Sequence, residues 1–331
     1  MQGDDLPKFV ENPQNFVDLN TLGAEEIAGD YLEWSWSAAT ALNGAHIGVP
    51  TDVGGMAVAY RTDLFEAAGL PTDSTSVSAL WPTWDDFIKV GEAYVAQTGK
   101  KFVDNSSQSI FFQAVNQVEA KYYSPDGDLI YDSNPEIKAA FDLALKADAS
   151  GISARLAGWS DGWNTGMGKG DFAVMAAPSW MLGSIRSNAP DTSGLWGVAE
   201  IPEKAGNWGG SYLAIPAGAK NPQAAWEYIK EMQSPESQLE HFVTSGALPT
   251  TPGVYADPAL LEYRDPFFPD APIGQIYTAS VEAMSPFFIG PESGPIGTEF
   301  INAVVAVEGG SLSADEAWQK ALDNIKLAIG E

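Results

Sequence analysis

Two tryptophans stand beside polar side chains where predicted loops meet regular structure, and this pairing suits contacts with a sugar. Trp208 lies in a glycine-flanked loop, with Asn207 before it and Ser211 close behind. Trp180 stands two residues after a proline at a predicted helix start, and Asp52 follows a predicted strand. An indole stacks on the apolar C–H face of a pyranose ring, while carboxylate, amide and hydroxyl groups bind its hydroxyls. Because clefts in α/β proteins form at strand ends and helix starts, these five residues are the candidate ligand-binding set.

The composition favours the same chemistry. The 331 residues include 11 Trp, 11 Tyr and 15 Phe together with 33 Gly, and tryptophan is over-represented against ordinary proteins. A tryptophan can equally be a plain core residue, and we interpret Trp226, on the predicted helix after Pro222, in that way. A Trp-rich, acidic and Gly-rich chain indicates carbohydrate binding ahead of other functions.

The charge balance excludes several partners. Lys and Arg number 17 against 44 Asp and Glu, which gives a net charge of −27. Binding to nucleic acid or to an anionic membrane surface needs clustered Lys and Arg, so neither is expected. No apolar run is long enough for a transmembrane helix, and the first residues do not form a signal peptide, so we expect no direct membrane insertion by this chain. With 45% hydrophobic residues, the chain has enough apolar surface for about two folded domains.

Motifs for other chemistries are incomplete. The absence of cysteine excludes disulfides, zinc–thiolate sites and thiol nucleophiles. The glycine-rich stretch 162–172 fails the phosphate-loop pattern, because Trp163 and Gly170 stand where Gly and Ser or Thr are needed. His46 and His241 are interpreted as structural residues. Three aspartates between positions 126 and 132 lack the spacing of a calcium loop.

Glycoside hydrolysis is the enzymatic alternative, because glycosidases combine paired carboxylates with aromatic subsites. Among 44 acidic residues nothing in the sequence singles out one pair, so no catalytic residue is nominated. Release of reducing sugar from an oligosaccharide distinguishes a hydrolase from a binding protein.

Hydrophobic spacing and punctuating residues predict strands that alternate with helices, which is typical of an α/β architecture with mixed sheets. Strands are predicted within 46–50, 56–65, 125–132, 171–178, 195–202 and 211–218, the last two joined by the loop 203–210. Helices are predicted within 17–43, from residue 84 after a Thr83 cap, within 106–117 and 135–149, from about residue 179, twice within 221–246 with a break at 234–235, and within 313–329 after a capping box.

Longer motifs resemble a known family. They are GVPTDVGGMAVAYRTDLFEAAGLP (48–71), WPTWDDFIKVGEAY (81–94), KGDFAVMAAPSWMLGSI (169–185), NWGGSYLAIPAGAKNPQAAWEYIKEM (207–232) and SPESQLEHFVTSGALPTT (234–251). In this order they resemble the family 1 extracellular solute-binding proteins of bacterial ABC sugar importers. PTDVGGMAVAYR, NWGGSYLAIP and APIGQIY (271–277) most resemble the binding proteins for cellobiose and cello-oligosaccharides.

The resemblance implies an α/β, two-lobe periplasmic-binding-protein-like (type II) fold with a ligand cleft between the lobes. Residues 1–56 and 213–252 would form the first lobe, and residues 57–212 and 253–331 the second. Family members have a first βαβ unit before the segment that the start of this chain resembles, so we expect the first lobe to be incomplete and to lack that unit.

The motif positions also imply roles for individual residues. Asp52 would bind sugar hydroxyls from the first lobe, and Trp180 would stack on a ring from the second. The crossover loop would be lined by Asn207, Trp208 and Ser211. Three further positions are carried over from the motifs, namely Trp163, Asn105 and Trp36.

The implied partners are an oligosaccharide ligand and the permease subunits of an ABC transporter, at an extracellular, cell-surface or periplasmic location. The resemblance implies no cofactor, no metal and no covalent step. A different disaccharide or oligosaccharide bound by the same fold is the alternative to cellobiose.

Overall fold

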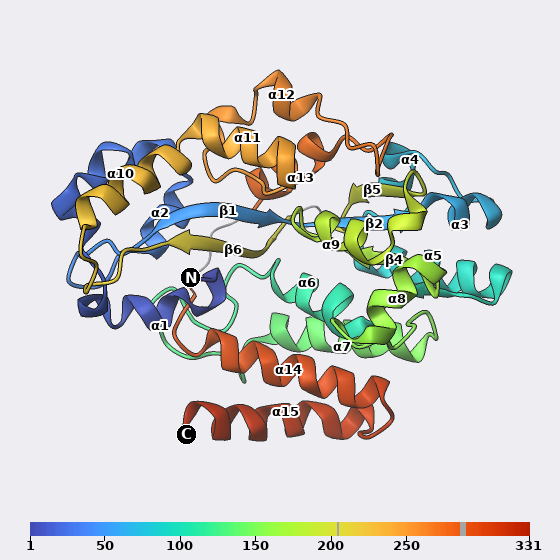
Figure 1. Ribbon diagram of the computed structural model, residues 1–331. Helices are drawn as coiled ribbons and strands as arrows, with labels where there is room; N and C mark the ends of the chain where they lie inside the picture. The colour runs from blue at the N-terminus through green and yellow to red at the C-terminus, as the bar shows by residue number, and fades with distance from the viewer. Residues whose placement is uncertain (204, 285–288) are drawn as a thin grey trace.

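The computed structural model describes residues 1–203, 205–284 and 289–331 and has two β-sheets at its centre (Figure 1). The strands are β1 (Val49–Gly55), β2 (Ala57–Arg61), β3 (Lys101–Val103), β4 (Phe172–Ala176), β5 (Trp196–Glu200) and β6 (Asn207–Leu213). β1 and β6 form an antiparallel two-stranded sheet. The second sheet has the order β3-β4-β2-β5, with β3 and β4 parallel and the other pairs antiparallel. The predicted mixed α/β architecture is confirmed.

The chain passes between the two sheets in two places. Met56 alone separates β1 of the two-stranded sheet from β2 of the four-stranded sheet. The chain returns to the two-stranded sheet between β5 and β6. In the two-stranded sheet Asp52 is the partner of Ser211, and Gln2 forms a bridge with Ser211 from the other side. Residues at the start of the chain, β6 and β1 therefore lie side by side. The lobe boundaries after residues 56 and 212 fall at the first passage and near the end of β6, and they stay predictions.

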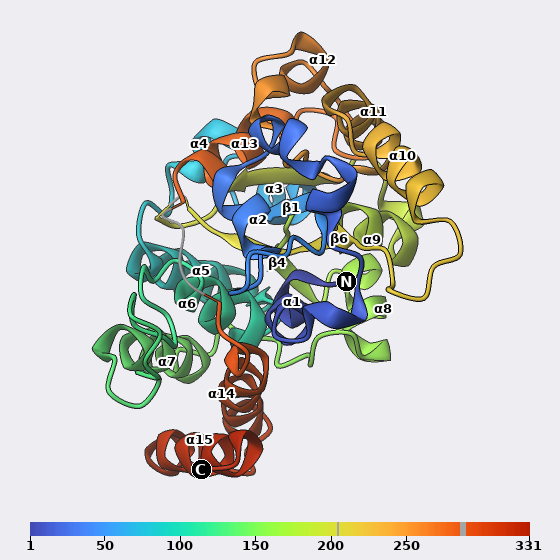
Figure 2. The same ribbon diagram turned by 90° about the vertical axis from the view of Figure 1, so that its left-hand side faces the viewer.

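Helices cover both sheets. They are α1 (Leu6–Val10), α2 (Glu33–Ala38), α3 (Thr62–Ala67), α4 (Ser74–Ser78), α5 (Trp84–Thr98), α6 (Gln113–Val115), α7 (Pro135–Ala149), α8 (Asp161–Lys169), α9 (Met181–Asn188), α10 (Pro222–Met232), α11 (Pro235–Ser245), α12 (Pro258–Leu261), α13 (Ile273–Glu282), α14 (Ser293–Glu308) and α15 (Ala314–Ile329). α10 and α11 lie on the opposite side of the β1–β6 sheet from the α14–α15 pair (Figures 1 and 2). Within the described ranges no helix is both long and apolar enough to cross a membrane.

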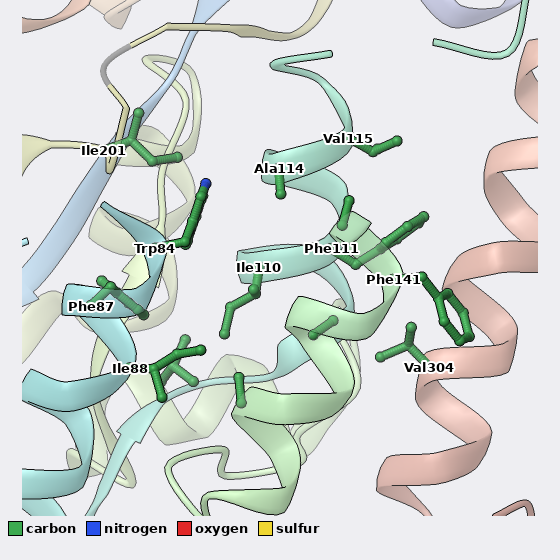
Figure 3. Close-up of a cluster of buried hydrophobic side chains, with 14 of the residues drawn as sticks. Trp84, Phe87, Ile88, Ile110, Phe111, Ala114, Val115, Phe141, Ile201 and Val304 are labelled. Atoms are coloured by element: carbon green, nitrogen blue, oxygen red, sulfur yellow. The ribbon is translucent and has the colours of Figure 1, made fainter. Parts of the chain in front are cut away.

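A buried hydrophobic cluster fixes the short π-helical turn η6 (Ser107–Phe112), which leads into α6. Figure 3 shows Ile110 and Phe111 of this turn between side chains of α5, α7 and α14. Phe111 meets Phe141 of α7 with ring centroids 5.9 Å apart, and both rings are fully buried. Because one face of η6 is anchored in the core, its other face has a fixed position.

The helix starts that the sequence predicted are confirmed. Thr83 accepts a hydrogen bond from the Asp86 backbone N–H at the start of α5, and Asn134 caps α7 in the same way. Ser313 and Glu316 form the predicted capping box of α15. These signals are local, because a cap needs only the side chain and the first turn that follows it.

Two predicted elements are wrong. Residues 17–43 do not form a continuous helix, because three short 3₁₀ turns precede α2 and Gly23 ends the first of them with a φ of +91°. The apolar residues whose spacing resembled a helix are buried instead by packing of these turns against α10. The strand predicted within 125–132 is reduced to an isolated bridge between Tyr123 and Leu129, because the chain turns at residues 125–127 between these two residues.

The third correction concerns the environment of Trp208. The predicted loop 203–210 ends early, because residues 207–210 belong to β6; its Lys204 lies outside the described residues. Gly209 and Gly210 have φ values of +86° and +111°, and the pairing with β1 contains irregular steps, so glycine permits an extended strand that bulges. β1 likewise continues through Pro50, where the sequence had predicted its end.

Candidate ligand-binding site

A cleft of about 980 Å³ lies where the β1–β6 sheet approaches η6 and α14. Its lining comes from the segment 3–11, from α2, from β1 and β6, from η6 and the residues that follow α6, and from the start of α14. This volume is at the upper end of the range for small-molecule sites, roughly 300–1,000 Å³. The cleft is the candidate site, and three of the five candidate residues, Asp52, Asn207 and Trp208, line it.

Four aromatic residues form a packed group, here called the aromatic wall: Phe112, Trp159, Trp180 and Trp208. The Phe112 and Trp208 ring centroids are 4.8 Å apart, and Trp180 meets Trp208 edge-on at 5.6 Å. Trp180 also stacks on Trp159 at 6.0 Å with an interplanar angle of 14°. Phe112, Trp159 and Trp208 line the cleft, whereas Trp180 lies behind them and donates its indole N–H to the Trp208 carbonyl at 3.0 Å. The structure thus gives Trp180 a supporting position.

Trp159 is the most exposed member of the wall. The residue is 51% exposed, although an indole gains more from burial than most side chains do. Its backbone has a φ of +67°, a left-handed conformation that is strained for a bulky residue. Sequence reasoning missed Trp159, although Gly158 before it resembles the glycine context that singled out Trp208. An exposed indole on a strained backbone at a cleft is typical of a residue that contacts ligand.

Polar groups on the two-stranded sheet face the same cleft. Asp52 accepts a hydrogen bond from the Thr51 hydroxyl at 2.8 Å, and burial raises the pKa of its carboxyl, an effect that Thr51 and Ser211 oppose. The Asn207 side chain accepts from the Gly54 N–H at 2.8 Å and donates to the Gly209 carbonyl at 2.9 Å. Asn207 therefore shapes the bulged strand that carries Trp208. Ser211 does not line the cleft itself but faces Asp52 across the strand pair.

The remaining candidate residues are held away from the cleft surface. Asn105 is fully buried, and Trp163 is 1% exposed with its indole N–H bonded to Asp104 at 2.7 Å. Trp36 stacks on His46 with ring centroids 4.2 Å apart, in a separate cluster beside α10. The first two lie directly behind cleft residues, because Asn105 precedes η6 and Trp163 packs on Trp159 at 5.1 Å.

The cleft also contains a lysine that sequence reasoning missed. Lys121 donates to Asn116 Oδ1 at 2.6 Å, and its ammonium group lies 5.0 Å from the centre of the Tyr122 ring and 5.6 Å from that of Phe112. Burial lowers its pKa to about 8, while Asp4 acts in the opposite direction. A polar group with two aromatic neighbours is typical of a site that fixes the orientation of a ligand.

His46 is a structural residue, in agreement with its interpretation from the sequence. It is buried, its Nδ1 lies 2.9 Å from the Thr40 hydroxyl, and burial lowers its pKa to about 4. Among the residues that the structure describes, no three His, Asp or Glu side chains come together as a metal site would require.

The chain is similar in sequence to known solute-binding proteins. A family model described as bacterial extracellular solute-binding protein matches residues 1–267. A lactose-binding protein of Rhizobium radiobacter is 30% identical over 204 residues, which are 58% of this chain and 46% of that protein. An arabinooligosaccharide-binding protein of Halalkalibacterium halodurans is 22% identical over 272 residues, 78% of this chain and 59% of that protein. The chain thus spans about half the length of the curated relatives it matches.

Solved structures show the fold. A family 1 extracellular solute-binding protein superposes with a TM-score of 0.89 at 33% identity, over 99% of this chain and 84% of that chain. The acarbose-binding GacH receptor of Streptomyces glaucescens has a TM-score of 0.77 at 18% identity, over 100% and 83%. A maltose-bound MalE3 protein of T. maritima has a TM-score of 0.75 at 18% identity, over 99% and 83%. The predicted two-lobe periplasmic-binding-protein type of α/β fold is confirmed.

Proposed function

Because the chain belongs to the family of bacterial extracellular solute-binding proteins, we propose that it captures an oligosaccharide outside the cytoplasm and delivers it to the permease subunits of an ABC importer. The observation that carries this proposal is the combination of one large cleft with an aromatic wall and a polar strand edge. Sugar rings are amphipathic, with apolar faces and polar edges. A site that binds them needs both kinds of surface in contact with one ligand.

The aromatic wall supplies the apolar contacts of the proposal. Trp159 and Trp208 present indoles to the cleft, and Phe112 extends the surface toward Lys121. Removing about 100 Å² of apolar surface from water on each stacked ring contributes about 2 kcal/mol at roughly 25 cal/mol per Å². Asp52 and Gln108 supply hydrogen-bonding groups in the same cleft.

The lining charges favour a neutral ligand. Among the residues that the structure describes, seven charged ones line the cleft, five acidic and two basic: Asp4, Asp5, Glu11, Asp52 and Glu299 against Lys8 and Lys121. A carboxylate or sulfate on the sugar would be repelled by this balance, because like charges in a partly dry cleft are weakly screened. The proposed ligand class is therefore a neutral oligosaccharide.

Cellobiose or a cello-oligosaccharide is the proposed ligand within that class. The supporting features are the segments 50–61, 207–216 and 271–277, which resemble binding proteins for these sugars. Lactose is the ligand named for one relative and arabino-oligosaccharide for another, and a similar structure contains β-1,6-galactobiose. These sugars are therefore the competitors of cellobiose in any binding test.

Closure of two lobes on the sugar is the proposed mechanism of delivery. We assign residues 1–56 and 213–252 to one lobe and residues 57–212 and 253–331 to the other, and the chain crosses between the two sheets at Met56 and between β5 and β6. A permease that recognises only the closed form then responds to loaded protein, because ligand stabilises closure. The reaction is capture and release, with no bond made or broken.

Calorimetric titration against a panel tests the proposal: cellobiose, cellotriose, lactose, arabinotriose, maltose and a galacturonic acid oligomer. We expect at least one neutral oligosaccharide to bind with micromolar or tighter affinity, with a cello-oligosaccharide tightest and the acidic oligomer without measurable heat. A parallel assay for reducing sugar addresses hydrolysis. Absence of binding across the panel contradicts capture, and reducing-sugar release that depends on the protein favours the hydrolase alternative.

A further inference from the structure

A buried carboxylate lies directly behind the aromatic wall. Asp104 follows β3 and is 2% exposed, and it does not line the cleft. Its Oδ2 accepts hydrogen bonds from the Trp163 indole N–H at 2.7 Å and from the Asn105 amide at 3.0 Å. Its Oδ1 accepts from the Asn105 backbone N–H at 2.8 Å. A third side chain, Ser109, hydrogen-bonds to the same carboxyl and itself accepts from the Ala176 N–H, so that its hydroxyl proton is available to Asp104.

All of these neighbours are donors, so the pocket suits an ionised carboxylate. A protonated acid or an amide would turn a donor of its own toward the Asn105 or Trp163 N–H, and one of these bonds would be lost. Hydrogen bonds to an ionised acceptor are also stronger than neutral ones. The charge state of Asp104 therefore decides how firmly Asn105 and Trp163 are held.

One connection runs from Asp104 through Trp163 to the cleft. Trp163 lies on α8, and its ring packs on Trp159 at 5.1 Å with an interplanar angle of 54°. Trp159 in turn stacks on Trp180, which is bonded to the backbone of Trp208. Fixing the Trp163 ring thus supports the exposed Trp159 indole from behind, where its left-handed backbone alone would leave it free to change conformation.

A second connection runs through Asn105. Its side-chain oxygen accepts from the Ser107 hydroxyl at 2.9 Å and from the Gln108 backbone N–H at 2.7 Å, which caps the start of η6. η6 carries Gln108 and Phe112, both of which line the cleft. The two connections start at one carboxylate and reach the cleft at three side chains.

The position is costly for stability. Burial raises the pKa of Asp104 to about 7, and Glu308 of α14 adds to this effect; next to Glu308 lies Asp148 of α7, paired with Arg155 at 2.7 Å. A carboxyl pKa above its unfolded value of about 3.9 means that the native state binds the proton more tightly than the unfolded chain. Stability due to Asp104 is therefore greatest below pH 4 and is lost as the pH rises to 7. The ionised form of Asp104 thus lowers the stability of the fold, although the hydrogen-bonding groups around it are all donors that favour a carboxylate. This combination is typical of a residue that is retained for binding.

We infer that Asp104, as a carboxylate, is a positioning residue for the ligand cleft, holding Trp163 behind Trp159 and Asn105 at the start of the turn that presents Gln108 and Phe112. The inference deepens the proposed function and rests on it for its effect on affinity. Ligand affinity then follows the ionisation of Asp104: it is highest above pH 7 and falls as the pH is lowered to 5.

A ligand-free measurement tests the physical core of the inference. In the protein labelled with ¹⁵N-tryptophan, the Trp163 indole N–H signal is identified by its loss in Trp163→Phe. We expect this signal to titrate between pH 5 and 8 in the wild-type protein, and the Trp159 signal, identified with Trp159→Phe, to shift with the same midpoint. In Asp104→Asn both signals should be independent of pH, and in Glu308→Gln the midpoint should move to lower pH. Indole signals that do not titrate in the wild type, or that titrate unchanged in Asp104→Asn, overturn the inference.

The second measurement is affinity for the tightest-binding sugar of the panel at pH 5 and pH 8. We expect Asp104→Asn to weaken binding about tenfold at pH 8 and to reduce the difference in affinity between pH 5 and pH 8, although Lys121 and Asp52 still titrate in the cleft. Asp265→Asn is the matched control, because Asp265 is another buried carboxylate, paired with Arg186 away from the cleft, and its loss should leave the affinity unchanged. If Asp104→Asn does not fold, Trp163→Phe, which keeps an aromatic ring at this position but has no N–H, should weaken binding several-fold.

Wild-type affinity in both variants contradicts the positioning role, as does equal weakening in the Asp265→Asn control. Failure of the inference and failure of the proposed function are distinguishable. If no sugar binds the wild-type protein, the proposed function is wrong. The indole titration then still shows whether ionisation of Asp104 changes the environment of Trp163 and Trp159.

Discussion

Two tryptophan-rich regions of the molecule have similar composition and opposite character. The aromatic wall contains Trp159, half exposed and on a strained backbone, at the surface of the cleft. The second region, here called the α10 cluster, consists of Tyr31, Trp36, His46 and Trp226. Its Trp226 is fully buried on a regular helix, and its indole N–H has no hydrogen-bond partner. The α10 cluster is a closed core, whereas the wall leaves apolar surface open.

The difference shows what distinguishes a site from a core when both are aromatic. A closed core gains its stability from burial and tolerates an unsatisfied polar atom if the packing is good. Trp180 of the wall and Trp163 behind it donate their indole N–H groups to protein acceptors, which fixes ring orientation, and Trp159 keeps part of its face for another molecule. Removal of residues from the two regions should therefore affect different quantities.

The largest effect is expected from Trp226→Ala. Deleting a fully buried indole leaves a cavity, and we expect the free energy of unfolding to fall by about 3 to 5 kcal/mol. Because Trp226 lies outside the cleft, the affinity of the folded fraction for sugar should not change. Denaturant titration and calorimetric titration of the same preparation check both statements. A loss of affinity without loss of stability would remove the distinction between the two regions.

Trp159→Ala should show the reverse pattern. We expect the Kd for the best-bound sugar to rise by a factor of roughly ten to a hundred, equivalent to about 1.5 to 3 kcal/mol, because one stacking surface is lost. Stability should change by less than about 1 kcal/mol, since the residue is already half exposed in the native protein. Trp159→Gly sharpens the test, because glycine adopts the positive φ without strain and should be at least as stable as the alanine variant. Unchanged affinity in both variants would contradict the ligand role of the wall.

His46 allows a pH test of the α10 cluster. Its pKa is about 4 in the native protein and about 6.5 when unfolded, so the unfolded chain takes up the proton first as the pH falls. The stability contributed by neutral His46 is thus present above pH 6.5 and is lost toward pH 4. Between pH 7 and 5 we expect wild-type stability to fall by about 1 to 2 kcal/mol relative to His46→Gln. Denaturant titrations at both pH values measure this difference, and a parallel fall in the two proteins would show that His46 does not titrate as described.

Asp52→Asn is expected to have the smallest effect. The carboxylate offers a charge-assisted hydrogen bond to a sugar hydroxyl, and an amide keeps one acceptor, so the Kd should rise about fivefold, roughly 1 kcal/mol. Asp128→Asn, in an exposed turn away from the cleft, is the control and should bind as the wild type. Calorimetry measures the difference. Tighter binding by Asp52→Asn would indicate a ligand that avoids the carboxylate.

The sequence predicted those parts of the structure that depend on neighbouring residues. The caps at Thr83, Asn134 and Ser313 were recognised because each acts within one helical turn. The mixed α/β architecture followed from alternating strand and helix patterns. The helix predicted within 17–43 failed because the same apolar spacing is satisfied by short turns packed on α10, a tertiary contact that spacing does not encode.

The sequence predicted only part of the site, because the position of each ring depends on tertiary packing as well as on the local sequence. Gly158-Trp159 and Gly162-Trp163 look alike in the sequence, yet α8 turns Trp163 into the core while the left-handed backbone of Trp159 turns its ring outward. Trp180 was singled out as a stacking residue, but its position at the back of the wall depends on how the start of α9 packs against β6. Lys121 was missed because nothing in the sequence places it at the cleft: Tyr122 follows it directly, but Phe112 meets its ammonium group only in the folded chain.

A crystal structure of the full chain with its tightest-binding oligosaccharide tests the central claim most directly. We predict that one pyranose ring lies over the Trp159 indole and a second contacts Trp208, with carbon atoms within about 4 Å of the rings, and that Asp52 accepts a hydrogen bond from a hydroxyl. The α10 cluster should be unchanged. A sugar bound elsewhere, or bound in the cleft without contact to either indole, would contradict the account.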